Sequence, residues 1–228
     1  PKAAAVVRRG CGIIHSPPPN PVRKELQSWN LEKARDVIGV LPDLPVLLIF
    51  GGSKGARSLN RAVLQVLPDL LSEMQVIHIS GQLDWDEVEK AAADLPNDLA
   101  VRYHAYPYLH EEMGAAMTVA NLAVSRAGAS VLGELPNFGL PAILVPYPHA
   151  WRYQKVNASY LAERGAAVVI RDEAIGANLL QVVRDLMKDE ARREQMQREM
   201  RSLARPQAAD CIADLLVGLA ARNPKEGC

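Results

Sequence analysis

The sequence predicts an α/β protein with a Rossmann-like, doubly wound sheet of six parallel strands, followed by C-terminal helices. Between Leu44 and Ile170, short apolar runs alternate with longer stretches in which apolar residues recur at helical spacing, a pattern typical of βαβ units. After Ile170 the short apolar runs end and only helical patterns remain. Because parallel strands joined by helices take right-handed crossovers, we expect one sheet with helices on both faces.

The first unit shows this pattern clearly. An apolar run at 45–50 predicts a buried strand, and the glycines of 51–55 end it. From Ala56 to Leu71, apolar side chains recur at the spacing of one helix face. A helix buried on that face is therefore expected.

The remaining units repeat this order. Strands are expected at 75–79, 100–103, 121–125, 141–145 and 167–170, with helices at 85–93, 109–118, 129–137 and 153–164 between them. Amphipathic helices at 178–188, 189–204 and 208–221 follow, and Pro206 separates the last two. At the other end, the four prolines between Ser16 and Pro21 predict a stiff, extended linker.

Composition and charge exclude several classes of protein. Lys and Arg number 26 and Asp and Glu number 26, so no overall positive field is available to bind nucleic acid. No apolar run reaches the roughly 18 residues that a membrane-spanning helix needs. The histidines and cysteines show no metal-ligand spacing, so neither a metal ion nor another cofactor is expected.

Three strand-end loops carry the candidate binding residues, because ligands of open parallel sheets lie beyond the carboxyl ends of the strands. The first loop, Gly51 to Gly55, links a strand to a helix, and its glycines allow backbone N–H groups to approach a phosphate closely. It matches neither GxxxxGK[ST] nor GxGxxG. The alternative interpretation is a tight turn that binds no ligand.

The second and third loops offer other groups. The second, 126–130, opens a helix at whose N-terminus the amides of Ala129 and Ser130 can bind an anion. Glu134 lies one turn further, where a carboxylate can accept both hydroxyls of a ribose. In the third loop, 146–154, Gln154 begins an i, i+3 pair with Asn157 that can present two amides to a sugar. The alternatives are a helix-dipole interaction for Glu134 and helix capping or surface polarity for the amides.

Four segments carry a resemblance to a known family. They are Asn20-Pro21-Val22-Arg23, the run Gly51-Gly52-Ser53-Lys54-Gly55-Ala56-Arg57-Ser58-Leu59-Asn60, the run Ser125-Arg126-Ala127-Gly128-Ala129-Ser130 with Glu134, and Gly139-Leu140-Pro141-Ala142-Ile143-Leu144-Val145-Pro146 leading to Gln154 and Asn157-Ala158. In order and spacing they resemble the C-terminal domain of the MurG family. Members of this family are glycosyltransferases of the GT-B class, which is built from two Rossmann domains. The MurG family transfers N-acetylglucosamine (GlcNAc) from UDP-GlcNAc to a lipid-linked MurNAc-pentapeptide in peptidoglycan synthesis.

The resemblance implies a role for each candidate residue in holding UDP-GlcNAc. It places Arg23 at the diphosphate, Ser53 beside the phosphates of UDP, the backbone near Leu109 at the uracil edge and Gln154 at the GlcNAc hydroxyls. The turn that cradles the α-phosphate and grips the ribose comprises Ala129, Ser130, Val131, Leu132, Gly133 and Glu134, and Asn157 completes the substrate-binding set. No catalytic residue is implied in this chain.

The sequence departs from the family at four places. Lys54 stands where Gln is usual, Val131 where Thr is usual, Tyr153 where His or Gln is usual, and 16–19 where Thr-Gly is usual. Val131 has no hydroxyl to donate, so a phosphate contact there must come from backbone amides or from Lys54. Tyr153 bears on which sugar is selected.

The resemblance also implies a domain organisation and partners. Residues 1–44 are expected to be an N-terminal remnant and interdomain linker, 45–205 the UDP-sugar-binding domain, and 206–228 a crossover helix and tail. The family's N-terminal domain, with its acceptor loop and membrane-facing patch, is not in this chain, so the chain alone is expected to be inactive. The full enzyme is expected in the cytoplasm, peripheral on the inner face of the membrane. Two alternatives stay open, another GT-B transferase with a different UDP-sugar and a non-catalytic nucleotide-binding module.

Overall fold

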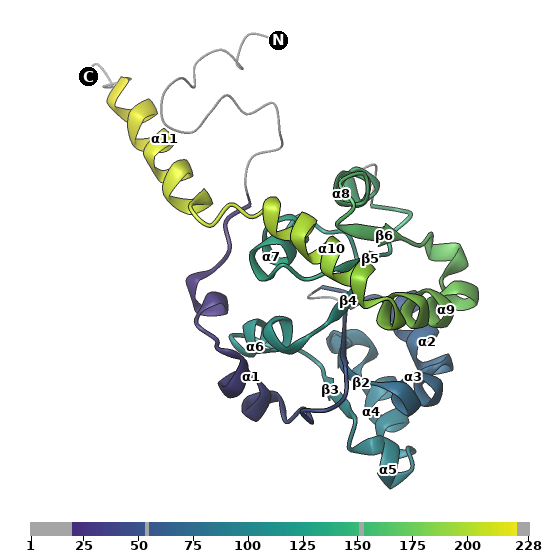
Figure 1. Cartoon of the computed structure of the whole chain (residues 1–228). Coiled ribbons are helices and arrows are strands. Elements are labelled where there is room, and N and C mark those ends of the chain that lie inside the picture. Colours follow the sequence, from purple (N-terminus) through teal and green to yellow (C-terminus); the bar gives the residue numbers. More distant parts are fainter. Residues whose placement is uncertain (1–19, 53–54, 151–152, 223–228) are drawn as a thin grey trace.

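The computed structural model describes residues 20–52, 55–150 and 153–222. Its centre is a sheet of six parallel strands (Figure 1) in the order β3-β2-β1-β4-β5-β6. The strands are β1 (Val46–Phe50), β2 (Gln75–Ile79), β3 (Tyr103–Tyr106), β4 (Leu122–Ser125), β5 (Ala142–Leu144) and β6 (Ala167–Val169). The predicted doubly wound, Rossmann-like sheet is confirmed.

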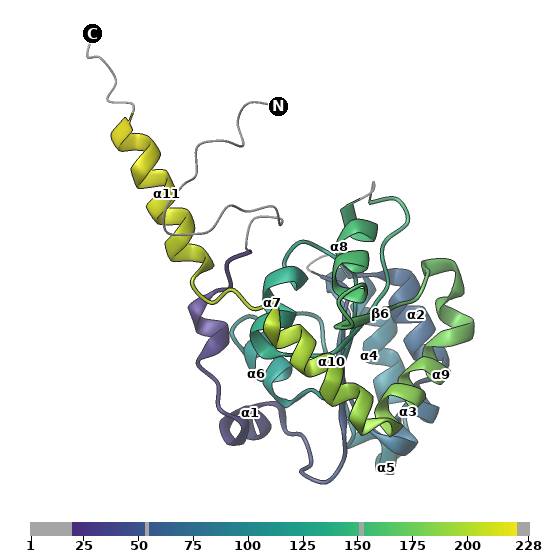
Figure 2. The ribbon, with the colours of Figure 1, turned by 45° about the horizontal axis from the view of Figure 1, so that its top comes forward.

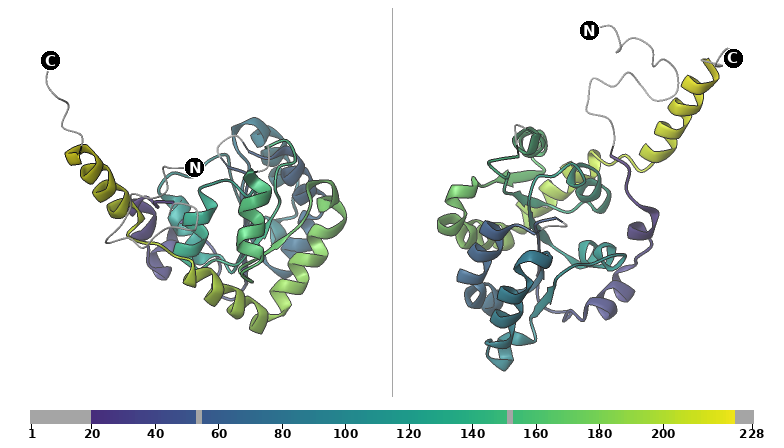
Figure 3. Two further views of the ribbon diagram at one scale, coloured as in Figure 1. Left: turned by 90° about the horizontal axis from the view of Figure 1, so that it is seen from above. Right: turned by 180° about the vertical axis from the view of Figure 1, so that it is seen from behind.

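Helices cover both faces of the sheet, as the views from two further directions show (Figures 2 and 3). One face packs against α1 (Leu31–Ile38), α6 (Glu112–Val119), α7 (Val131–Phe138) and α8 (Tyr153–Ala162). The other packs against α2 (Arg57–Gln65), α3 (Leu67–Glu73), α4 (Trp85–Ala93) and α9 (Ile175–Lys188). Helix α10 (Glu190–Ser202) touches both cores, Met200 in the first and Met196 in the second.

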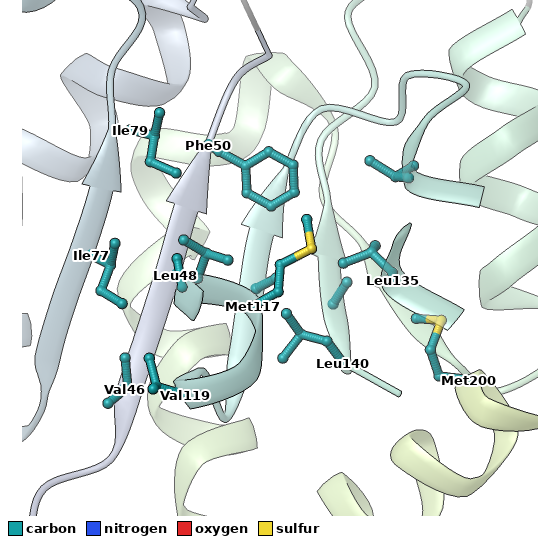
Figure 4. Close-up of a cluster of buried hydrophobic side chains, with 14 of the residues drawn as sticks. Val46, Leu48, Phe50, Ile77, Ile79, Met117, Val119, Leu135, Leu140 and Met200 are labelled. Atoms are coloured by element: carbon teal, nitrogen blue, oxygen red, sulfur yellow. The ribbon is translucent and has the colours of Figure 1, made fainter. Parts of the chain in front are cut away.

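Strand β1 shows why the sheet is buried on both sides. Val46, Leu48 and Phe50 point into the first core (Figure 4), whereas Leu47 and Ile49 point into the second. Successive strand residues face opposite sides, so a strand covered on both faces must be apolar throughout. This explains why the run that predicts β1 does not alternate with polar residues.

The helix expected from Ala56 to Leu71 is two helices, and the prediction of one is wrong. Helix α2 ends at Gln65, and α3 begins at Leu67 with Pro68 in its first turn. Pro68 has no N–H to continue the ladder of α2, but it is tolerated in a first turn, where no such bond is made.

The third strand lies three residues later than predicted, at Tyr103–Tyr106 instead of 100–103, because α5 (Asn97–Ala100) occupies the earlier residues. Pro96 occupies the residue before this short helix, with an extended backbone. Strand β3 pairs with β2 and has no second neighbour in the described sheet, so it tolerates polar side chains. His104 therefore gives the strand a weaker apolar pattern than that of β1 or β2.

Two further segments frame the sheet. Before β1, the short 3-10 helix η2 (Lys24–Gln27) and α1 pack against α6. Asn30 caps α1 by accepting a hydrogen bond from the Lys33 amide, and Gly39 ends it with a left-handed backbone. At the other end, α11 (Ala208–Arg222) extends away from the rest of the fold (Figure 1). In the described part of the chain, every helix is too short or too polar to span a bilayer.

Candidate functional site

Three loops meet at the carboxyl edge of the sheet. Strand β4 pairs with both β1 and β5, all parallel, so the loops that follow these strands are neighbours. The winding of the chain reverses between β1 and β4. Such a reversal opens a crevice between the flanking loops, where ligands of doubly wound sheets bind.

The first loop begins at Gly51 and ends at Gly55, and the structure requires glycine at both of these positions. Gly55 has a φ of 76°, and a Cβ there would collide with the carbonyl oxygen of Ser80. A Cβ on Gly51 would lie 2.5 Å from the Cβ of Ala56. The glycines therefore let the loop pass directly over the end of β2. The predicted site residue Ser53, and Lys54 beside it, lie outside the described residues.

A buried polar network supports this loop from below. Asn60, on α2, donates hydrogen bonds of 2.9 Å to the Ser80 carbonyl and to the Asp84 carboxylate. Its side-chain oxygen lies 3.0 Å from Nε2 of His78, and Arg57 donates to Asp84 at 2.9 Å. Burial lowers the pKa of His78 to about 4, against the opposing charge of Asp84. The histidine is therefore neutral at pH 7, and its role is to hold Asn60 in position by a hydrogen bond.

Arg126, at the end of β4, links the three loops through one buried guanidinium group. It donates to Asp172 at 2.5 Å, to Ser58 at 2.6 Å and to the Val145 carbonyl at 3.1 Å, and it lies over the ring of Tyr147. Ser58 in turn donates to Asp172 at 2.7 Å. The sequence motif contained Arg126, but nothing in the sequence indicated its partner Asp172, which follows β6.

The N-terminus of α7 is arranged to bind an anion. Ala129 and Ser130 are exposed, and within the described residues the amides of Ala129, Ser130 and Val131 donate no hydrogen bond to the backbone. Glu134 is mostly buried one turn later. Burial raises its pKa, while a hydrogen bond from the Ser130 side chain and the positive charge of Arg23 oppose the rise. The structure thus brings Arg23, Ser130 and Glu134 together.

The two amide side chains of α8 both hold loops in place. Gln154 accepts a hydrogen bond of 2.8 Å from the Tyr147 amide, which closes the third loop. Asn157 donates at 3.0 Å to the carbonyl of Ala127, which anchors the loop before α7. Each contact engages one end of an amide, leaving the NH₂ group of Gln154 and the oxygen of Asn157 as further polar groups.

An open cavity of about 860 Å³ lies between the first and third loops. Gly51, Gly55 and Gln154 line it, together with Arg57 and Arg126. Ser130 and Glu134 do not line this cavity. Two parts of the predicted site, the glycine loop and Gln154, thus line the same cavity. The N-terminus of α7 lies outside it, at the end of the loop that follows the adjacent strand β4.

Of the other predicted residues, Val131, Leu132 and Gly133 lie in the first turn of α7, and Leu109 lies in the loop before α6. Leu109 is buried in the same core cluster as Val131, and Leu132 is packed against that cluster. Gly133 is buried where the backbone of Asn20 crosses the helix. Among the described residues, no group of three or more His, Cys, Asp and Glu side chains is placed to hold a metal ion.

This arrangement can be compared with known protein families. The model of the glycosyltransferase family 28 C-terminal domain matches residues 46–213. The chain belongs to the family 28 C-terminal domains. The match includes all three loops and the sheet that positions them.

Relatives of this family 28 domain have closely similar sequences. It is 42% identical over 223 residues to the UDP-N-acetylglucosamine–N-acetylmuramyl-(pentapeptide) pyrophosphoryl-undecaprenol N-acetylglucosamine transferase of Roseiflexus sp. (strain RS-1), covering 89% of this chain and 50% of that protein. It is 38% identical over 215 residues to the transferase of the same name from Desulforudis audaxviator (strain MP104C), covering 90% and 56% respectively. The family 28 domain therefore spans about half the length of these curated relatives.

Solved structures agree with this assignment. The crystal structure of MurG from Acinetobacter baumannii matches with a TM-score of 0.69 and 28% identity, over 84% of this chain and 54% of that one. The predicted resemblance to the MurG family is confirmed. A UDP-GlcNAc 2-epimerase from Neisseria meningitidis shares the fold, with a TM-score of 0.55 and 16% identity over 82% of this chain and 48% of that one.

Proposed function

We propose that this chain is the donor-binding half of an inverting glycosyltransferase that moves GlcNAc from UDP-GlcNAc to a lipid-linked MurNAc-pentapeptide in peptidoglycan synthesis. The observation that carries the proposal is the N-terminus of α7. The amides of 129–131, which donate to no backbone carbonyl of the described residues, lie there together with the carboxylate of Glu134 and the guanidinium of Arg23. These groups are complementary to the phosphate and ribose of a nucleotide.

Each group has a defined task in this proposal. The amides of Ala129, Ser130 and Val131 bind the α-phosphate, so the missing hydroxyl at Val131 is no obstacle. Glu134 accepts hydrogen bonds from the ribose hydroxyls. Arg23 and the positive end of α7 stabilise the negative charge that grows on UDP as the sugar leaves. Ser53 is proposed to add a contact beside the phosphates.

The base and the sugar use the neighbouring loops. The backbone at Leu109 reads the uracil edge, and the NH₂ group of Gln154 donates to the GlcNAc hydroxyls. Because the Tyr147 amide already fixes the oxygen of Gln154, the orientation of that NH₂ group is set before the donor arrives. Asn157 holds the loop before α7 and offers its oxygen to the sugar.

The acceptor and the remaining machinery belong to the other half of the relatives' length. We propose that residues 45–205 form the donor unit, that 1–44 connect it to a preceding acceptor domain and that 206–228 lead back toward that domain. The preceding domain would then bind the lipid-linked acceptor at the inner face of the membrane. The chain by itself would bind the donor without transferring the sugar.

Calorimetric titration of the chain with a panel of nucleotide sugars tests this function. UDP-GlcNAc should bind, and ADP-glucose should bind at least about tenfold more weakly, a difference of about 1.4 kcal/mol. UDP-galactose and UDP-glucose test the sugar, since Tyr153 replaces the usual His or Gln. Tighter binding of another UDP-sugar would favour a different UDP-sugar transferase, and equal affinity for UDP-GlcNAc and ADP-glucose would contradict the uridine site.

A further inference from the structure

The segment 20–29, which we term the strap, runs along the outside of α7 and α6 (Figure 1). At its first residue, the side-chain amide of Asn20 donates a hydrogen bond of 2.6 Å to the carbonyl of Ala129. A Cβ on Gly133 would lie only 2.5 Å from the carbonyl oxygen of Asn20 and 3.2 Å from Val22. The strap therefore rests directly on the first turn of α7.

The other end of the strap is seated on the start of α6. The indole N–H of Trp29 donates at 3.1 Å to the carbonyl of Glu111. Leu26 is buried, and a Cβ on Gly114 would collide with its carbonyl oxygen. Glu111 follows Leu109 by two residues, so Trp29 is bonded to the loop proposed to read the base.

The contact of Asn20 has a directional effect on the phosphate turn. In a trans peptide the C=O of one residue and the N–H of the next point in opposite directions. The Ala129 carbonyl accepts this bond together with one of 3.2 Å from the Leu132 amide, and the shorter bond from Asn20 ties its direction to the strap. That direction sets the direction of the Ser130 N–H, which donates to no backbone carbonyl of the described residues. Arg23, between the two anchors, is close enough to Glu134 to affect its pKa.

We propose that the strap is a positioning element of the donor site, with Asn20 setting the phosphate-binding turn and Trp29 setting the base-reading loop. The proposal rests on the proposed function. It assigns to Asn20 and Trp29 separate effects on the two ends of one nucleotide. Neither residue is required to touch the ligand itself.

The test compares UDP with uridine, which lacks the phosphates, by NMR titration of the full chain and its variants. Asn20→Ala should weaken UDP binding about tenfold and uridine binding less than about twofold, because it disturbs the phosphate turn alone. Trp29→Phe keeps an aromatic ring at this position but removes the indole N–H. It should weaken binding of UDP and uridine by the same factor, about threefold.

Asn30→Ala is the matched control, because Asn30 also makes one side-chain bond to the backbone, at the cap of α1 away from the loops. It should change neither affinity by more than about twofold. The deciding quantity is the ratio of UDP affinity to uridine affinity in each protein. If Asn20→Ala leaves this ratio as it is in the unaltered chain and in Asn30→Ala, the strap has only a structural role and the proposal is overturned. Absence of UDP binding by the unaltered chain would instead overturn the proposed function, and the strap proposal with it.

Discussion

Replacing Arg126 with methionine should lower the free energy of unfolding by about 3 to 5 kcal/mol, the cost of leaving one partner of a buried ion pair uncompensated. Arg126 is only 7% exposed, and the side chain of Asp172 is 15% exposed. Without the guanidinium, the carboxylate of Asp172 keeps only the hydroxyl of Ser58 among its described side-chain partners. Urea denaturation at pH 7 measures the loss.

Arg61→Met is the matched control for this effect. Arg61 lines the same cavity, but its pair with Glu87 is long, at 3.6 Å, and the two side chains are 58% and 48% exposed. Exposed pairs of this kind contribute about 0 to 1 kcal/mol. Equal losses for Arg126→Met and Arg61→Met would show that Arg126 does not hold the three loops together.

Replacing Glu134 with alanine should weaken the binding of UDP-GlcNAc by about 1.5 to 3 kcal/mol, because hydrogen bonds to a charged acceptor are stronger than neutral ones. Calorimetry measures the change. The 2′,3′-dideoxy analogue of UDP separates the ribose from the phosphates. It should bind the unaltered chain more weakly than UDP does, yet lose little further affinity in the Glu134→Ala variant. An unchanged affinity for UDP-GlcNAc would contradict the ribose role.

The same residue predicts a dependence on pH. Burial raises the pKa of Glu134 above its ordinary value of 4.5. Protonation turns one carboxylate oxygen into a donor and removes the charge that strengthens both hydrogen bonds, so affinity should be full above the raised pKa and should fall as the pH drops through it. Glu134→Gln should bind more weakly at pH 7 and should lack this dependence, because its amide does not titrate.

Much of the fold was predictable because the strands inside the central sheet are local apolar runs. Strand β2 lies at 75–79, as predicted, since both of its faces are buried. Strand β3 was placed three residues too early because an edge strand carries a weaker apolar signal. The break between α2 and α3 was visible in the sequence as Pro68, but the apolar spacing continued across it.

The site was less predictable than the fold, because its key contacts join residues far apart in the chain. Parallel strands end at one edge of the sheet, and that arrangement followed from the alternation of strands and helices, whereas the strand order that makes the three loops neighbours comes from the structure. The hydrogen bonds of Asn20 to Ala129 and Arg126 to Asp172 had no local signal. Gln154 and Asn157 were expected to face a sugar, yet each also bonds to a loop backbone, a contact that helical spacing alone does not reveal.

A crystal structure of the chain with UDP-GlcNAc tests the central claim most directly. We expect the α-phosphate within hydrogen-bonding distance of the Ser130 and Val131 amides, the ribose hydroxyls on Glu134, and the sugar beside Gln154. A nucleotide that lay wholly in the cavity beside Arg57 and Arg61, without touching α7, would contradict it.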